Sequence, residues 1–197
     1  MSIEFWFEFA STYSYPAAMR IEQVAARYGK SVVWRPFLLG PIFNSQGWQD
    51  SPFNIYPAKG RYMWRDLERI CEGLQIPFAR PTQFPRNGLL AARIVAAAQD
   101  EAWVPAFVRN VYRASFARDV DIASPDVLME CLQGLTSDPD AWLAASQEDG
   151  AKTRLRENTE RAIALGIFGS PSFTSGTELF WGNDRLESAL EWQQPAW

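Results

Sequence analysis

The chain has 197 residues, a formal net charge of −4 and a hydrophobic content of 47%. A chain of this length and composition is expected to form one globular unit with a substantial core. The acidic balance leaves no basic footprint for nucleic acid, and no run of about 18 apolar residues predicts a membrane span. Because residues 1–4 carry an acid and no basic charge, we expect no signal peptide and a cytoplasmic protein.

The residue types that the chain lacks exclude several kinds of catalysis. It has no histidine, which excludes every triad built on a histidine base. Its two cysteines, Cys71 and Cys131, lie far apart and form no C-x-x-C motif, so no dithiol redox site is expected. Without clustered cysteines or histidines we expect no metal site. Both cysteines are expected to be buried free thiols.

The N-terminal segment predicts a βαβ unit. Apolar residues alternate over residues 3–9, which is typical of a strand. Apolar residues then recur with helical spacing over 13–28, and Gly29 supplies a stop signal. Residues 31–37 predict a second strand. Two strands joined through one helix by short links are expected to be parallel.

The middle of the chain predicts helices. Residues 38–54 contain Gly, Pro, Asn and Ser with little periodicity, and we expect a loop that covers a cleft. Beyond this loop, apolar spacing and N-cap signatures indicate an all-helical block. The predicted helices lie at 63–73, from Asn87 to about 100, at 105–116, from Ser124, from Asp138, and at about 149–165.

The C-terminal segment returns to strands. Residues 172–174 and 177–181 flank Ser175-Gly176, which is typical of a two-residue hairpin turn. Residues 184–187 resemble a capping box that opens a last helix. The predicted order is therefore βαβ, a long helical block, and ββα.

Ser11 and Thr12 lie where the first strand gives way to the helix. In a βα unit, ligands bind beyond the carboxyl end of the strand and near the helix N-terminus. Two interpretations are available: one of the hydroxyls only caps the helix, or a hydroxyl donates a hydrogen bond to a bound anion or thiolate. Position alone leaves both interpretations open.

Ser170 and Pro171 stand at the start of the third predicted strand, where proline is tolerated. If the bond between them is cis, the backbone of Ser170 can pair with a peptide-like ligand. The alternative is an ordinary trans turn before an edge strand.

Two further segments carry polar groups beside glycine. In the 181–184 segment, Asp184 caps the last helix, or the turn holds the carboxylate or amine of a ligand. The 54–62 segment also has two interpretations. Asn54 and Lys59 form a site for a carboxylate, or they simply belong to a solvated loop.

These features occur in an order that resembles a known family. The motifs are FASTYSYPA, WRPFLLGPIF, PAKGRYMWRD, FPRN, GIFGSPSF and ELFWGNDRLE. Together they are similar to the 2-hydroxychromene-2-carboxylate isomerases, close to the kappa-class glutathione transferases within the DsbA-like thioredoxin fold. The resemblance covers nearly the whole chain.

The resemblance implies an α/β thioredoxin-like fold with a large all-helical insertion. Residues 1–38 and 166–197 would form the thioredoxin-like domain, and residues 39–165 the helical insertion domain. It also implies glutathione as cofactor, a small aromatic 2-oxo acid as substrate, and a homodimer, with no nucleic acid and no membrane partner.

The resemblance assigns roles to particular residues. Ser11 matches the catalytic serine that holds the glutathione sulfur, and Ser170 matches the residue whose backbone pairs with the cysteinyl part. Asn183 and Asp184 match the site for the γ-glutamyl end. The implied cofactor-binding residues are Ser11, Thr12, Ser170, Pro171, Trp181, Gly182, Asn183 and Asp184. The implied substrate-binding residues are Asn44, Asn54, Lys59, Phe84 and Arg86.

The function implied is a glutathione-dependent isomerase that interconverts 2-hydroxychromene-2-carboxylate and trans-o-hydroxybenzylidenepyruvate in aromatic hydrocarbon degradation. The alternatives are a kappa-like glutathione transferase that conjugates electrophiles and a non-catalytic DsbA-like binding module.

Two positions depart from the family pattern. Thr12 stands where many relatives have proline, which leaves open which hydroxyl meets the sulfur. Asn44 stands where several isomerases carry a lysine, which leaves the particular substrate open.

Overall fold

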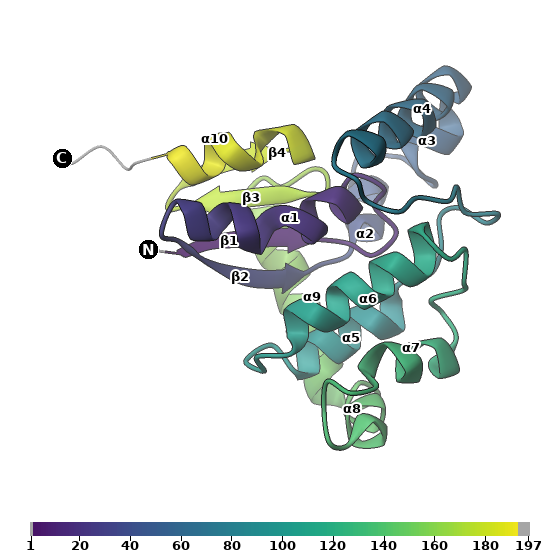
Figure 1. The fold of residues 1–197 in the computed structure, drawn as a ribbon, viewed down its shortest axis with the longest axis vertical. Coiled ribbons are helices and arrows are strands. Elements are labelled where there is room, and N and C mark those ends of the chain that lie inside the picture. Colours follow the sequence, from purple (N-terminus) through teal and green to yellow (C-terminus); the bar gives the residue numbers. More distant parts are fainter. Residues whose placement is uncertain (1, 193–197) are drawn as a thin grey trace.

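A four-stranded mixed sheet lies at the centre of the computed structural model, which describes residues 2–192 (Figure 1). The strand order is β2-β1-β3-β4. β1 is parallel to β2, whereas β3 is antiparallel to both of its neighbours. The predicted parallel pair is therefore confirmed. The predicted hairpin is present, but its two-residue turn is Gly176-Thr177 rather than Ser175-Gly176, because Ser175 pairs with Glu178. The strands are β1 Ser2–Phe7, β2 Ser31–Pro36, β3 Ser172–Ser175 and β4 Glu178–Trp181.

Helices occupy most of the chain between β2 and β3, as the sequence predicts. The α-helices are α1 Ser14–Arg27, α2 Leu39–Ser45, α3 Pro52–Ile55, α4 Pro57–Gly73, α5 Leu89–Ala97, α6 Val104–Phe116, α7 Pro125–Leu132, α8 Pro139–Ala145, α9 Asp149–Ala164 and α10 Leu186–Glu191, and η1 Asn183–Arg185 is a 3₁₀ turn. The strands with α1 and α10 come from the two ends of the described chain, with the other helices between them in sequence. The architecture is a thioredoxin-like fold with a helical insertion.

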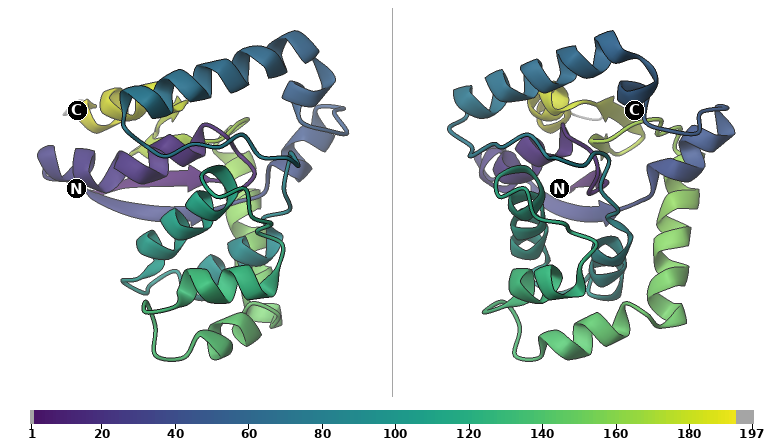
Figure 2. Two further views of the ribbon diagram at one scale, coloured as in Figure 1. Left: turned by 45° about the vertical axis from the view of Figure 1, so that its right-hand side comes forward. Right: turned by 90° about the vertical axis from the view of Figure 1, so that its right-hand side faces the viewer.

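The two faces of β1 are buried by different helices. Phe5 lies in the main core with residues of α1, α6 and α10, because alternate residues of a strand point to opposite faces. Its ring centroid is 5.0 Å from that of Trp34 and 5.6 Å from that of Phe173. Trp6 lies on the other face and packs with Ala162 of α9. Figure 2 shows α9 and α1 on opposite sides of the sheet. The predicted domain boundary after residue 165, just beyond α9, stays a prediction.

Two elements in the middle of the chain differ from the predictions. The segment 38–54 is not a plain loop, because it contains the short helices α2 and α3. Helix α4 begins at Pro57 rather than at 63. Its first residues are mostly exposed, so this turn lacks the apolar periodicity on which the prediction depended. Pro57 at the first helical position is the signal that the periodicity could not supply.

The last helix has no capping box, so that prediction is wrong. A 3₁₀ turn comes first, and no side chain caps either η1 or α10. The Glu187 carboxylate instead forms an ion pair with Arg20 of α1. The carboxylate is thus directed toward α1, and it makes no side-chain cap.

The two cysteines are free and buried, as predicted. Burial raises the pKa of each thiol to about 11. Within residues 2–192, no helix has both the length and the apolar character needed to cross a membrane.

Candidate functional site

A cavity of about 1320 Å³ opens beyond the carboxyl end of β1. Five segments line it: the residues after β1, the α2–α4 region, the stretch around residue 86, the approach to β3, and the turn after β4. Ligands of open α/β sheets bind at this end of the strands. Every residue predicted for the site lines the cavity except Asn54.

Ser11 lies in the turn between β1 and α1, and its hydroxyl faces two neighbouring segments. Its Oγ donates a hydrogen bond to the Ser170 carbonyl oxygen at 2.8 Å and accepts one from the Ser14 backbone N–H at 3.4 Å. The formal N-cap of α1 is Tyr13, which makes no side-chain cap. Ser11 therefore combines a weak contact to the helix N-terminus with a short bond to the segment that carries Pro171.

Thr12 also lines the cavity, but its side chain is directed elsewhere. Only 2% of the residue is exposed, and its Oγ1 donates to the Met63 sulfur at 3.1 Å. Ser11 is partly exposed and its hydrogen-bond partner, the Ser170 carbonyl, belongs to another residue of the cavity, whereas the Thr12 hydroxyl is buried against a thioether of the core. Of the two adjacent hydroxyls, the geometry favours Ser11 as the donor available to a ligand.

The Ser170–Pro171 peptide bond is cis. The Ser170 side chain forms a junction beneath the cavity, because its Oγ accepts from the Glu8 N–H at 3.0 Å and lies 2.7 Å from Ser14 Oγ. The Pro171 carbonyl accepts from the Gly182 N–H at 2.9 Å. Segments that lie far apart in sequence, at 8–14, 170–171 and 182, are thereby held together.

The turn after β4 brings Trp181, Gly182, Asn183 and Asp184 to the cavity. Gly182 has φ +109°, a backbone conformation that residues other than glycine rarely adopt. The Asn183 amide oxygen accepts from Arg20 Nε at 3.1 Å, so α1 positions this turn. Asp184 caps no helix; its Oδ2 lies 3.5 Å from Arg185 Nη1.

The predicted cations differ in what holds them. Arg86 is buried: its guanidinium donates to the Ser115 carbonyl at 2.8 Å and forms an ion pair with Asp119. Lys59 is exposed, with its Nζ 5.1 Å from the centroid of the Tyr56 ring. Within residues 2–192, no carboxylate lies at ion-pair distance from Lys59. Lys59 is thus better placed than Arg86 to meet the carboxylate of a ligand.

The other predicted substrate residues have unlike positions. Asn44 is exposed at the end of α2 and lines the cavity, and Phe84 lines it beside Trp64, with ring centroids 4.9 Å apart. Asn54 does not line it. Its amide nitrogen donates to both carboxylate oxygens of Asp50, at 3.2 and 3.1 Å. The part assigned to Asn54 stays a prediction, and the geometry gives it a role in holding this loop.

Several residues of the cavity were not predicted. Glu8 is the most consequential, because it is an ionisable group on the cavity wall next to Ser11. The sequence predicts Glu8 within the strand at 3–9, whereas β1 ends at Phe7, so Glu8 lies just beyond the carboxyl end of the strand. Aromatic residues from the α2–α3 region, Phe43, Trp48 and Phe53, also line the cavity. The irregular pattern of that region concealed them.

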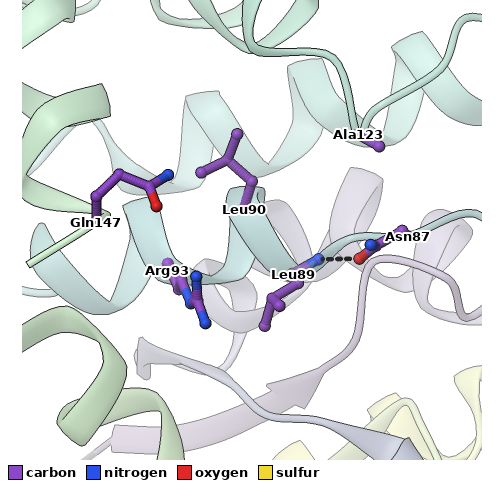
Figure 3. Close-up of a pocket in the computed structure, with 6 residues that line it drawn as sticks. All are labelled: Asn87, Leu89, Leu90, Arg93, Ala123 and Gln147. Atoms are coloured by element: carbon purple, nitrogen blue, oxygen red, sulfur yellow. Dashed lines mark hydrogen bonds between the residues drawn. The ribbon is translucent and has the colours of Figure 1, made fainter. Parts of the chain in front are cut away.

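A second hollow, of about 150 Å³, lies near the start of α5 (Figure 3). Asn87 accepts a hydrogen bond from the Leu89 N–H there at 3.0 Å, and Arg93 and Gln147 border the space. Small-molecule sites usually occupy about 300–1,000 Å³, so this hollow is too small to compete with the main cavity as the candidate site.

The fold and the site define the class of protein. The DSBA-like thioredoxin domain family matches residues 2–191, and the chain therefore belongs to that family. Within it, the chain is 28% identical over 187 residues to a 2-hydroxychromene-2-carboxylate isomerase of Sphingobium xenophagum, covering 94% of each chain. It is 26% identical to human glutathione S-transferase kappa 1, covering 94% of this chain and 88% of the relative.

Similarity to solved structures agrees with these relatives. The structure of a 2-hydroxychromene-2-carboxylate isomerase superposes with a TM-score of 0.80 at 26% identity, covering 94% of this chain and 91% of that one.

Proposed function

We propose that the protein is a glutathione-dependent isomerase that interconverts 2-hydroxychromene-2-carboxylate and trans-o-hydroxybenzylidenepyruvate. The observation that carries the proposal is the Ser11 hydroxyl on the wall of a cavity that no described cysteine lines. Both cysteines are buried in the core instead. A pocket with a hydroxyl donor and no thiol of its own suits a nucleophile that a second molecule supplies.

The residues present fit glutathione in chemistry and in space. The cavity volume of about 1320 Å³ exceeds what one small ligand needs, which leaves room for a tripeptide and an aromatic acid. Ser11 would hold the sulfur, Ser170 the cysteinyl backbone, and Asn183 with Asp184 the γ-glutamyl end. When bound, glutathione supplies a sulfur nucleophile that reversibly converts a double bond into a single one.

The residues of the chain favour this chemistry in two ways. The Ser11 hydroxyl and the N-terminus of α1 stabilise negative charge on sulfur, which lowers the pKa of a thiol that titrates at about 8.5 when free. Lys59 pairs with the carboxylate of the aromatic acid and so orients it. Phe84 and the aromatic residues of the α2–α3 region supply apolar contacts for its ring.

The leading alternative is a kappa-like transferase, which the similarity to human glutathione S-transferase kappa 1 favours. An isomerase returns glutathione, whereas a transferase consumes it. We therefore expect isomer formation from the chromene acid with no loss of titratable thiol, and no turnover when glutathione is omitted. Stoichiometric loss of thiol without isomer formation would exclude the isomerase and support the transferase.

The second alternative is a binding module without catalysis. Calorimetry with glutathione separates it from both enzymes, because an enzyme of either kind must bind glutathione at millimolar concentration. The absence of binding heat would support the non-catalytic module. Chemical cross-linking or light scattering, and cell fractionation, test the homodimer and the cytoplasmic location that belong to the same proposal.

A further inference from the structure

Glu8 is held firmly at the base of the cavity by its backbone. Its N–H donates to Ser170 Oγ at 3.0 Å, and its carbonyl accepts from the Ser11 N–H at 2.9 Å and from the Tyr112 hydroxyl at 2.9 Å. The same residue thus contacts both segments proposed to hold the sulfur and the cysteinyl backbone. A group so placed is oriented before any ligand arrives.

The Glu8 carboxyl retains one open oxygen. Oε2 accepts a hydrogen bond from the Ala10 N–H at 3.1 Å. Among residues 2–192, none donates to Oε1, and no cation lies at ion-pair distance. Glu8 is partly exposed and is one of the residues that line the cavity that the ligand would fill.

The surroundings of the Glu8 carboxyl raise its pKa to near neutral pH. Burial raises its pKa to about 7, against the opposing effect of the Ala10 amide. Other ionisable groups belong to elements around it: Tyr112 of α6, whose pKa burial raises, and Lys59, Asp66, Arg86 and Asp184 on the cavity wall. A carboxylate of ordinary pKa is about four units too acidic to take a proton from a thiol near 8.5, whereas Glu8 is closely matched to it.

We propose that Glu8 accepts the thiol proton of bound glutathione and returns it when the reaction is complete. The inference rests on the proposed function. Glu8 Oε1 takes the proton: the S–H bond breaks, an O–H bond forms on the carboxyl, and the electron pair stays on sulfur. The reverse transfer restores the carboxylate and the thiol, so the cycle is balanced in protons and electrons.

The other carboxylates described on the cavity wall are less suited to this task. Asp66 accepts a hydrogen bond from the Tyr13 hydroxyl at 3.0 Å, and Asp50 is held by the Asn54 amide. Asp184 is largely exposed and lies beside Arg185. Glu8 is the one that combines partial burial, an open oxygen and contact with the Ser11 and Ser170 segments. In a chain without histidine, it is also the group best matched to a proton at neutral pH.

The test compares the wild type with Glu8→Gln, which keeps the size of the side chain and an oxygen for the Ala10 N–H. The absorbance of the thiolate near 240 nm reports how much bound glutathione is ionised. Calorimetry with glutathione in two buffers of unlike ionisation enthalpy reports how many protons reach the solvent. Glu8→Asp tests rescue by a shorter carboxylate, and Glu72→Gln removes an exposed carboxylate outside the cavity as the matched control.

At pH 7.5 the wild type is expected to form thiolate and to release almost no proton, because Glu8 retains it. Glu8→Gln is expected either to lose the thiolate absorbance or to release about one proton for each thiolate formed. Turnover should fall about 100-fold, the usual scale for a lost general acid–base group, and Glu72→Gln should match the wild type. A wild type that releases one proton per thiolate, with Glu8→Gln unchanged, would overturn the inference alone. No glutathione heat in the wild type would overturn the proposed function as well.

Discussion

The Ser11 hydroxyl donates a hydrogen bond of 2.8 Å to the carbonyl oxygen of Ser170. This bond uses the single proton of the hydroxyl and one of the two acceptor sites of the Ser170 carbonyl, which belongs to the backbone proposed to pair with the cysteinyl part of glutathione. Rotation of the Ser11 side chain would free both groups together. The hydroxyl could then donate to sulfur while the carbonyl accepts from the ligand backbone, so binding exchanges one internal bond for two bonds to the ligand.

Ser11→Ala should lower turnover by roughly tenfold to a thousandfold, the scale of losing one oriented donor at a developing charge. Thr12→Val should have a smaller effect on turnover, because the Thr12 hydroxyl is bonded to the Met63 sulfur. Steady-state kinetics of both variants, with the thiol pKa of bound glutathione, make the comparison. An unchanged rate for Ser11→Ala would remove Ser11 from the mechanism.

Glu8 should make the stability of the protein depend on pH. Its pKa is about 7 in the folded chain, above the ordinary value of 4.5. Between these values the folded state holds a proton that the unfolded state has lost, so stability falls as pH rises. The loss is up to about 3 kcal/mol from pH 4.5 to 7. Urea unfolding across this range should show a flatter profile for Glu8→Gln than for the wild type, and parallel profiles would contradict the raised pKa.

Substitution of Lys59 should change substrate binding, whereas substitution of Arg86 should change the free energy of unfolding. Lys59→Met should raise KM for the aromatic acid about tenfold, because it removes a cavity cation that no carboxylate of the described chain neutralises. Arg86→Met should instead lower the free energy of unfolding by about 1–3 kcal/mol, since it leaves the Ser115 carbonyl without the Arg86 donor and removes the ion pair with Asp119. Kinetics and urea unfolding of both variants test this assignment. The reverse pattern would place the substrate carboxylate at Arg86.

Arg20→Met should weaken glutathione binding, although Arg20 acts on the site only through Asn183. Arg20 holds both the side chain and the carbonyl of Asn183, and it pairs with Glu187. Burial acts to raise the pKa of Glu187, but the hydrogen bond and charge of Arg20 outweigh it and lower the pKa.

The ion pair therefore stabilises the fold above the unfolded pKa of Glu187 and is lost as pH falls through the lower folded value. The free energy of unfolding of Arg20→Met should be about 1 kcal/mol lower than that of the wild type at pH 7, and the difference should be smaller at pH 3. Equal losses at both pH values would show that packing alone, and not the charge, is responsible.

Local patterns in the sequence were sufficient for the strands and for most helices. The alternating apolar residues that form β1 and Gly176, which has a positive φ in the turn at 176–177, are both features that a short stretch of sequence reveals. Helices α2 and α3 were missed because their residues pack against the cavity and the loop rather than along a regular apolar stripe. The capping box at 184–187 failed because a residue of α1, 167 positions from Glu187, holds the carboxylate.

The candidate site was predicted in outline through the family resemblance. Its segments follow strand ends and helix starts, which a single sequence reveals. Glu8 was missed because a carboxylate in an alternating strand reads as solvent-facing, and only the tertiary fold shows that it is partly buried beside Ser170. Likewise, the paired state of Arg86 depends on Asp119, a contact that no local pattern indicates.

The crystal structure of the protein with glutathione bound tests the central claim most directly. The account predicts the tripeptide in the 1320 Å³ cavity, with its sulfur within hydrogen-bond distance of Ser11 Oγ and its γ-glutamyl end at Asn183 and Asp184. It also predicts that Ser11 has released the Ser170 carbonyl. A sulfur nearer to Thr12, or glutathione bound outside this cavity, would contradict it.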